Sequence, residues 1–169
     1  MSRHDFNTPP DILDRVRMLD PRGIGLDPCS NATSLVHART SWNEDDNGLN
    51  AGRLWRGHGL VFMNPPHSMS PYNIEPWIEK AWLEFVSPMR ETLLRGGDQF
   101  VGLIPAKTDT AWFHDFAVPF HKLFLRGRPR YWQDGKATPG PGKFASMLIY
   151  AGAHPDRFGK AFADMGWIV

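Results

Sequence analysis

The chain has 169 residues, of which 41% are hydrophobic, and its 19 Lys and Arg residues against 18 Asp and Glu leave a formal net charge of +1. This length predicts one domain, residues 1–169, and the near-neutral charge excludes a protein that binds nucleic acid through its overall charge. Because Cys29 is the single cysteine and no apolar run suits a signal peptide or a membrane span, we expect a cytoplasmic protein with no disulfide and no membrane partner.

The first predicted element is a helix over residues 11–19. Its apolar residues Ile12, Val16 and Leu19 recur at helical spacing. Thr8 is a plausible N-cap, because its hydroxyl can accept a hydrogen bond from the first turn, where the two prolines that follow it are tolerated.

Two short strands are predicted next, over residues 23–26 and 35–38. In a doubly wound sheet, an acid after the first strand can bind an amine or hydroxyl of a nucleoside, and an acid after the second is the usual partner of its ribose. Asp27 follows the first strand, and Asp46 is our first choice after the second. Simpler interpretations stay open, since Asp27 can form an Asx turn and consecutive acids most often face solvent.

The apolar residues 60–63 predict a buried strand that two prolines stop, because proline can neither donate to a ladder nor enter a helix. The tetrapeptide Asn64-Pro65-Pro66-His67 that follows suits methylation of a planar amine, such as the exocyclic nitrogen of adenine. The lone pair of such a nitrogen is delocalised, so a catalyst must accept both N–H bonds, and Asn64 Oδ1 and the Pro65 carbonyl are two fixed acceptors. The His67 ring would stack on the base. A rigid turn explains the tetrapeptide equally well.

The second half of the chain predicts further helices and strands. They are helices over 76–86, 112–116 and about 157–163, and strands over 100–104, 122–125 and 147–150. The Gly- and Pro-rich residues 134–143 predict a mobile loop near the site.

Three arginines, Arg126, Arg128 and Arg130, would line one side of an extended chain and could neutralise phosphates, although a solvated face is the commoner explanation. The seven histidines show no paired metal spacing, so we expect no metal site. The chain also lacks the Gly-rich loop with Lys-Ser or Lys-Thr of nucleotide-hydrolysing enzymes.

A set of short motifs runs in order from Phe6 to Gly152. They are Phe6-x-Thr8-Pro9 with Ile12-Leu13, Leu26-Asp27-Pro28-Cys29-Ser30-Asn31, Asp46-Asn47-Gly48-Leu49, Asn64-Pro65-Pro66, Trp77-Ile78-x-Lys80-Ala81, Pro105-Ala106-Lys107-Thr108-Asp109-Thr110-x-Trp112-Phe113-His114, Arg126-Gly127-Arg128 and Ser146-x-Leu148-x-Tyr150. Together their order and spacing resemble the DNA N-6-adenine methyltransferase family typical of bacteriophages.

The resemblance implies an α/β, single-domain, Rossmann-like fold with a mostly parallel seven-strand sheet, S-adenosylmethionine as cofactor, and a flipped-out adenine of DNA as substrate. Taken together with the residues themselves, it leads us to expect these roles: cofactor binding by Phe6, Thr8, Asp27, Pro28, Ser30 and Asp46, catalysis by Asn64, Pro65, Pro66 and His67, and substrate binding by Lys107, Trp112, Arg126, Arg128 and Arg130. Trp112 would help to stack the base. Two features depart from the usual pattern: His67 stands where an aromatic such as Tyr is usual, and Asp27-Pro28-Cys29-Ser30 replaces the glycine-rich loop of most methyltransferases.

A phage-encoded enzyme of this kind would act in the bacterial host cytoplasm, as a monomer or weak dimer, for example in protection from restriction. Two alternatives stay open. The same fold could methylate RNA or a glutamine side chain, since Asn-Pro-Pro also suits an amide nitrogen. The chain could instead be a lapsed enzyme that only binds DNA.

Overall fold

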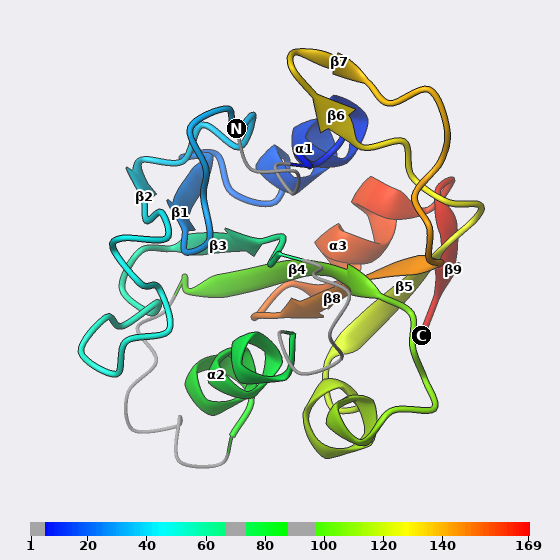
Figure 1. Ribbon diagram of the computed structural model, residues 1–169. Helices are drawn as coiled ribbons and strands as arrows, with labels where there is room; N and C mark the ends of the chain where they lie inside the picture. The colour runs from blue at the N-terminus through cyan, green and yellow to red at the C-terminus, as the bar shows by residue number, and fades with distance from the viewer. Residues whose placement is uncertain (1–5, 67–73, 88–96) are drawn as a thin grey trace.

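A seven-stranded mixed sheet runs through the middle of the protein (Figure 1). The computed structural model describes residues 6–66, 74–87 and 97–169. Within them the sheet has the order β2 (Thr40–Ser41), β1 (Ile24–Asp27), β3 (Leu60–Met63), β4 (Gln99–Pro105), β8 (Ser146–Ala151), β5 (His121–Leu125) and β9 (Gly166–Ile168).

The first four strands of the sheet are parallel, and the rest of the pairs are antiparallel. Because β4 and β5 both pair antiparallel with β8, they point the same way, so β2, β1, β3, β4 and β5 end at one edge, the carboxyl edge. The prediction of an α/β fold with a central sheet is confirmed, although the sheet is mixed rather than mostly parallel in its pairings.

The strands β1, β3, β4 and β8 are buried along their whole length because helices cover both faces of the sheet there. In β3, Leu60 and Phe62 pack in the layer of one face, whereas Val61 and Met63 pack in the layer of the other, and all four are fully buried. The continuous apolar run of residues 60–63 therefore follows from burial on both faces.

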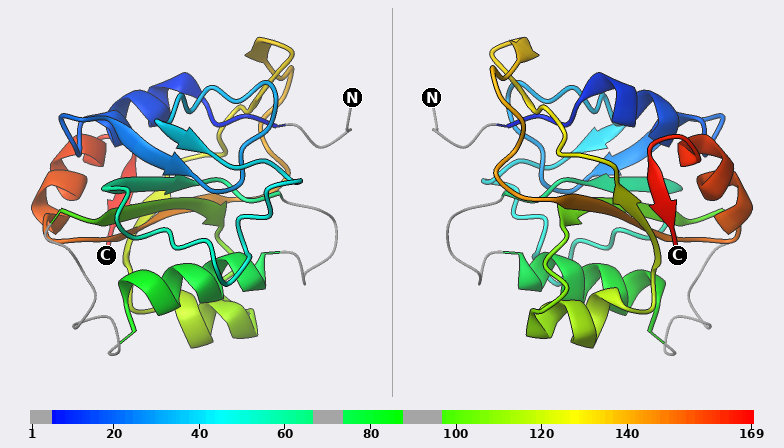
Figure 2. Two further views of the ribbon diagram at one scale, coloured as in Figure 1. Left: turned by 90° about the vertical axis from the view of Figure 1, so that its left-hand side faces the viewer. Right: turned by 90° about the vertical axis from the view of Figure 1, so that its right-hand side faces the viewer.

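Among the described residues, two helices lie on each face of the sheet (Figure 2). α1 (Pro10–Arg17) and α3 (Pro155–Phe162) cover one face, and α2 (Glu75–Phe85) and the short π-helical segment η2 (Phe113–Ala117) cover the other. These positions confirm the helices predicted over 11–19, 76–86, 112–116 and 157–163. The prediction of Thr8 as N-cap is wrong, since Pro9 occupies that position and no side chain caps the helix.

The predicted strand at residues 35–38 is wrong. Residue His37 has a φ of 51°, and Arg17 Nη2 donates to the carbonyl oxygens of Leu35 and Val36 at 2.8 and 3.1 Å. The Arg17 side chain thus binds two carbonyl oxygens that would otherwise accept hydrogen bonds from a neighbouring strand. The second strand is β2, in which Thr40 pairs with Leu26 of β1.

The expected loop at 134–143 begins with a hairpin, made of β6 (Trp132–Gln133) and β7 (Lys136–Ala137). Its turn residues Asp134 and Gly135 have φ values of 52° and 77°, as a two-residue hairpin turn of the Asp-Gly type requires. The hairpin is fixed to the amino-terminal segment, because Asn7 and Trp132 exchange both backbone hydrogen bonds, at 2.8 and 2.9 Å.

Candidate functional site

The candidate site lies where two parallel neighbours, β1 and β3, end. β1 ends at Asp27, and Asn64 comes directly after the last residue of β3. The order of the sheet reverses between these strands, since β2 lies beyond β1 and β4 lies beyond β3. Doubly wound sheets bind their ligands outside the carboxyl ends of the strands at such a reversal.

Asn64 presents an acceptor without a partner. Its Nδ2 donates to Thr8 Oγ1 at 3.0 Å, whereas its Oδ1 is buried and has no hydrogen-bond partner among the described residues. Leaving a buried acceptor unpaired costs about 1–3 kcal/mol, so such atoms are rare and need an explanation. Of the two prolines that follow, Pro65 is buried and Pro66 is exposed. His67, the predicted stacking ring, lies outside the described residues.

Thr8 belongs to a segment, residues 6–9, that crosses the carboxyl edge and that we call the strap. The neighbouring Asn7 is buried, its Nδ2 donates to the Thr33 carbonyl at 2.9 Å, and its Oδ1 accepts from Asn31 Nδ2 at 3.0 Å. These bonds fix the strap to the loop after β1. Sequence reasoning missed Asn7, which occupies the variable position of the Phe6-x-Thr8 motif.

Asp27 is a buried carboxylate, 3% exposed, at the end of β1. Its Oδ1 accepts from the Cys29 backbone N–H at 3.2 Å, and its Oδ2 accepts from Ser34 Oγ at 3.2 Å. Burial raises the pKa of Asp27 to about 6, although hydrogen bonds from Cys29, Ser30 and Ser34 oppose the change. The bond to Cys29 forms an Asx turn, as one interpretation of the sequence predicts. The raised pKa shows that the surroundings of Asp27 disfavour its ionised form, which is common at functional sites.

Cys29 connects the ends of the two strands. Burial raises the pKa of its thiol well above the ordinary value, and the charge of Asp27 raises it further, whereas the Asn64 backbone N–H opposes the change. The thiol is therefore neutral at physiological pH, and it interacts with both candidate site residues, Asp27 and Asn64.

The remaining predicted cofactor residues have different surroundings. Pro28 is buried and lies close to Gly48. A Cβ added at Gly48 would lie 2.0 Å from the Pro28 carbonyl oxygen. Ser30 donates a hydrogen bond to Asp27 from its side chain. Phe6 is 45% exposed and meets Tyr131 edge-on.

Asp46 is engaged within its own loop. One carboxylate oxygen accepts from the Asn43 backbone N–H at 3.0 Å, and the other pairs with Arg53 at 3.4 Å. The Arg53 guanidinium also lies 5.0 Å from the centroid of the Trp42 ring. A ribose hydroxyl at Asp46 would have to compete with these contacts.

Two predicted substrate residues follow β4 at the carboxyl edge. Lys107 is half-buried, and its Nζ lies 4.6 Å from the centroid of the Phe144 ring. Trp112 is 3% exposed and packs in the core cluster that includes residues of α2, so little of its side chain is accessible in this structure, and its role in stacking on a base stays a prediction.

Arg126, Arg128 and Arg130 follow β5 at the same edge, and all three are exposed. Gly127 has a φ of 78°, so the chain is not extended there and the alternation expected for a strand does not apply. The structure nevertheless brings the three arginines together around one pocket of about 370 Å³.

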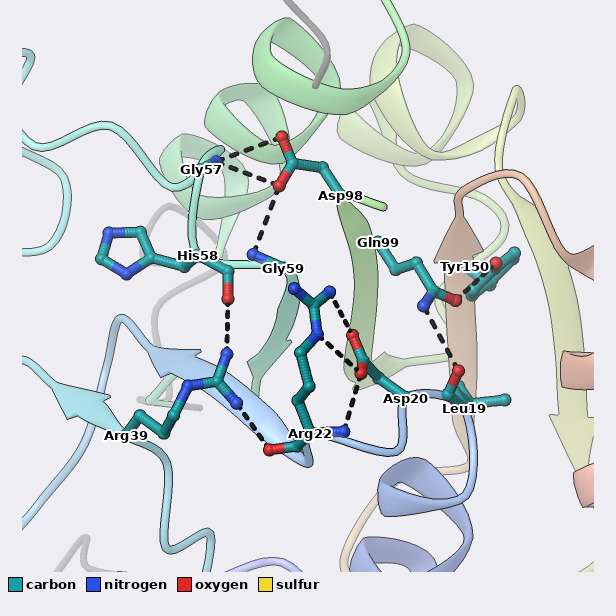
Figure 3. Close-up of polar contacts among 10 residues, drawn as sticks. All are labelled: Leu19, Asp20, Arg22, Arg39, Gly57, His58, Gly59, Asp98, Gln99 and Tyr150. Atoms are coloured by element: carbon teal, nitrogen blue, oxygen red, sulfur yellow. Dashed lines mark hydrogen bonds and ion pairs between the residues drawn. The ribbon is translucent and has the colours of Figure 1, made fainter. Parts of the chain in front are cut away.

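The opposite, amino edge of the sheet carries a network of polar residues that form hydrogen bonds and ion pairs with one another (Figure 3). Asp20 pairs with Arg22 at 2.8 Å, and this contact lowers the pKa of Asp20. The Asp98 carboxylate accepts from the backbone N–H groups of Gly57 and Gly59. These mutual contacts stabilise the amino ends of the strands, whereas the unpaired Asn64 Oδ1 lies at the carboxyl edge.

Two absences hold for the described ranges. No three His, Cys, Asp or Glu side chains within residues 6–66, 74–87 and 97–169 gather closely enough to hold a metal ion. The helices in those ranges do not combine the length and apolar character that crossing a bilayer needs.

Comparison with known proteins found no match among family models, curated proteins or solved structures.

Proposed function

We propose that the protein is a DNA adenine methyltransferase that uses S-adenosylmethionine and acts on the exocyclic amine of a flipped-out adenine. The observation that carries the proposal is the buried, unpaired Oδ1 of Asn64 directly after β3, with the buried Asp27 carboxylate at the end of the neighbouring strand β1, where the strand order reverses. The motif order described above supports the same activity.

Asn64 Oδ1 and the Pro65 carbonyl oxygen would accept the two N–H bonds of the amine. Accepting both bonds draws the nitrogen out of conjugation with the ring and directs its lone pair towards the methyl donor. Acceptors that are fixed before the substrate arrives need no reorganisation during the reaction. Flipping is required because the amine is otherwise engaged in its base pair.

Thr8 gives Asn64 its working orientation. Its hydroxyl is the partner of Asn64 Nδ2, so the amide has its nitrogen fixed and its oxygen free. Thr8 itself is 2% exposed and stands next to Asn7, which is bonded to the loop after β1. The strap thus supports the acceptor, a role that differs from the cofactor contact expected for Thr8.

The surroundings of Asp27 fit a cofactor with a positive charge and hydrogen-bond donors. S-adenosylmethionine supplies, when bound, an electrophilic methyl group on a cationic sulfur, together with an amino group. A cation beside Asp27 would offset the burial that raises the pKa of this carboxyl, so ligand binding and ionisation support each other. Asp46 fits less well, because Arg53 already neutralises it.

The fold is compatible with a Rossmann-like arrangement. Four parallel strands stand in the order β2-β1-β3-β4, with α1 and α3 on one face and α2 and η2 on the other. The sites of such folds lie at the switch point, which here falls between the ends of β1 and β3.

Transfer of a radiolabelled methyl group from S-adenosylmethionine to DNA, RNA and protein tests the proposal. We expect label in DNA, and loss of one fixed acceptor in Asn64→Ala should lower turnover by about 100- to 1000-fold. The exposed turn variant Asn50→Ala is the matched control, with wild-type turnover. Label in RNA or protein alone would select the other substrate class, and DNA binding without any transfer would indicate a lapsed enzyme.

A further inference from the structure

The pocket of about 370 Å³ is separate from the Asn64 acceptor and has a chemistry of its own. It lies between the first turn of α1 and the chain that follows β5, on the face of the sheet that α1 and α3 cover. Its apolar floor comes from Pro9, Ile12, Leu125 and Met165. A floor of this kind favours the flat, weakly polar body of a ligand.

Positive charge surrounds the floor. Arg126, Arg128 and Arg130 line the pocket with one opposing acid, Asp11. Elsewhere among the described residues, arginines such as Arg15, Arg17, Arg22 and Arg53 pair with acids, whereas these three take part in no ion pair there. On a chain with a net charge of +1, this concentration of unneutralised guanidinium groups favours a phosphate, which they can bind in a bidentate manner.

The backbone that carries the arginines is held at both ends. The Arg126 N–H donates to the Met165 carbonyl at 2.8 Å, and the Pro129 carbonyl accepts from the Gly142 N–H at 2.9 Å. These bonds, from distant parts of the chain, keep the arginine segment against the pocket in the absence of any ligand.

Trp132 completes the lining and is half-buried. Its backbone is fixed by both hydrogen bonds to Asn7, so the indole is positioned beside the arginines. An indole next to guanidinium groups is the combination with which proteins hold single-stranded nucleic acid, because the ring stacks on a base and the cations bind the backbone.

We propose that this pocket binds one nucleotide of a nucleic-acid strand, with the phosphate on Arg126, Arg128 and Arg130 and the base against Trp132. The volume suits one nucleotide unit and no longer segment. The proposal rests on the proposed function for its biological source, since Pro9 of the pocket adjoins Thr8, the partner of Asn64. The bound unit is then a neighbour of the nucleotide that is presented to Asn64.

Binding of thymidine monophosphate, measured by calorimetry without cofactor, tests the pocket. Thymine has no exocyclic amine, so this probe does not report on the methyl-acceptor site, and Asn64→Ala should bind it as the wild type does. Inorganic phosphate, thymidine and a thymidine tetranucleotide are the companion probes. We expect the nucleotide and the tetranucleotide to bind, and phosphate or thymidine alone to bind at least about tenfold more weakly.

The variants separate the two parts of the pocket. Replacing all three arginines with alanine should weaken nucleotide binding at least about tenfold and flatten its salt dependence. Trp132→Leu should weaken it, whereas Trp132→Phe, which keeps a ring, should retain most of it. Arg157→Ala removes an exposed arginine outside the pocket and should change nothing.

Three results would overturn the proposal: no nucleotide binding at millimolar concentration, phosphate binding as tightly as the nucleotide, or equal binding by the triple variant. Each can occur while methyl transfer to DNA is intact. Conversely, failure of methyl transfer leaves the nucleotide measurement unaffected, so the two proposals fail separately.

Discussion

Replacing Asp27 with Asn should separate stability from ligand binding. The carboxyl is 3% exposed, and burial raises its pKa to about 6 from an ordinary 3.8. Each factor of ten in proton affinity corresponds to about 1.4 kcal/mol, so the ionised carboxylate costs the folded state about 3 kcal/mol at pH 7. The asparagine keeps an acceptor for the Cys29 N–H, and its amide can donate to the Ser34 hydroxyl.

The direction of the pH dependence follows from the higher pKa in the folded protein. Between about pH 4 and pH 6 the folded state retains a proton that the unfolded state loses, so this group makes the wild type less stable as the pH rises through that window. Above it, Asp27→Asn should therefore be more stable than the wild type by up to about 3 kcal/mol. At pH 4 the two should be nearly equal.

Urea unfolding of both proteins at several pH values between 4 and 8 measures this difference, with the exposed variant Asp115→Asn as the control for loss of one negative charge. Calorimetry should show that Asp27→Asn has lost its affinity for S-adenosylmethionine. A variant that is less stable than the wild type at pH 7, with a deficit that grows from pH 4, would refute the reasoning. It would mean that the neighbours of Asp27 favour its charge.

Three further predictions concern single contacts. Thr8→Val should leave Asn64 Nδ2 unpaired, which should cost about 1–3 kcal/mol of stability and lower kcat of methyl transfer with little effect on KM. Thr8→Ser, which keeps the hydroxyl, should restore both stability and kcat. An unchanged kcat in Thr8→Val would exclude the positioning role. Gly48→Ala should destabilise the protein, because its Cβ would lie 2.0 Å from the Pro28 carbonyl oxygen, and a melting temperature equal to the wild type would show that the two loops separate readily. Asp98→Ala at the amino edge should lower stability, as urea unfolding would report, and leave cofactor affinity unchanged; a loss of affinity in a folded variant would contradict the assignment of the site to the carboxyl edge.

Much of the sheet could be predicted from the sequence, because its inner strands β3, β4 and β8 are largely apolar runs bounded by proline, glycine or polar residues. Residues 60–63 are four apolar residues followed by Asn64 and two prolines, and the structure shows all four buried in a strand. The position of Asn64 at a strand end follows from the same pattern.

The rest depends on contacts that local patterns do not contain. Thr8 looks like an N-cap from its neighbours, yet its hydroxyl is used by Asn64, 56 residues further along the chain. Residues 35–38 have strand-like composition, but the Arg17 side chain takes two of their carbonyl oxygens. The sequence did contain a signal for the hairpin turn at Asp134, because Asp-Gly is typical of two-residue turns. An interpretation based on the Gly- and Pro-rich composition of the segment overlooks this signal.

The identity of the product tests the central claim most directly. DNA incubated with the protein and S-adenosylmethionine should yield N6-methyl-2′-deoxyadenosine after digestion to nucleosides, as measured by mass spectrometry. Asn64→Ala, with cofactor affinity unchanged, should yield about 100- to 1000-fold less per unit time. Methylation of a different base, no methylated nucleoside from the folded wild type, or equal yields from the two proteins would contradict the account.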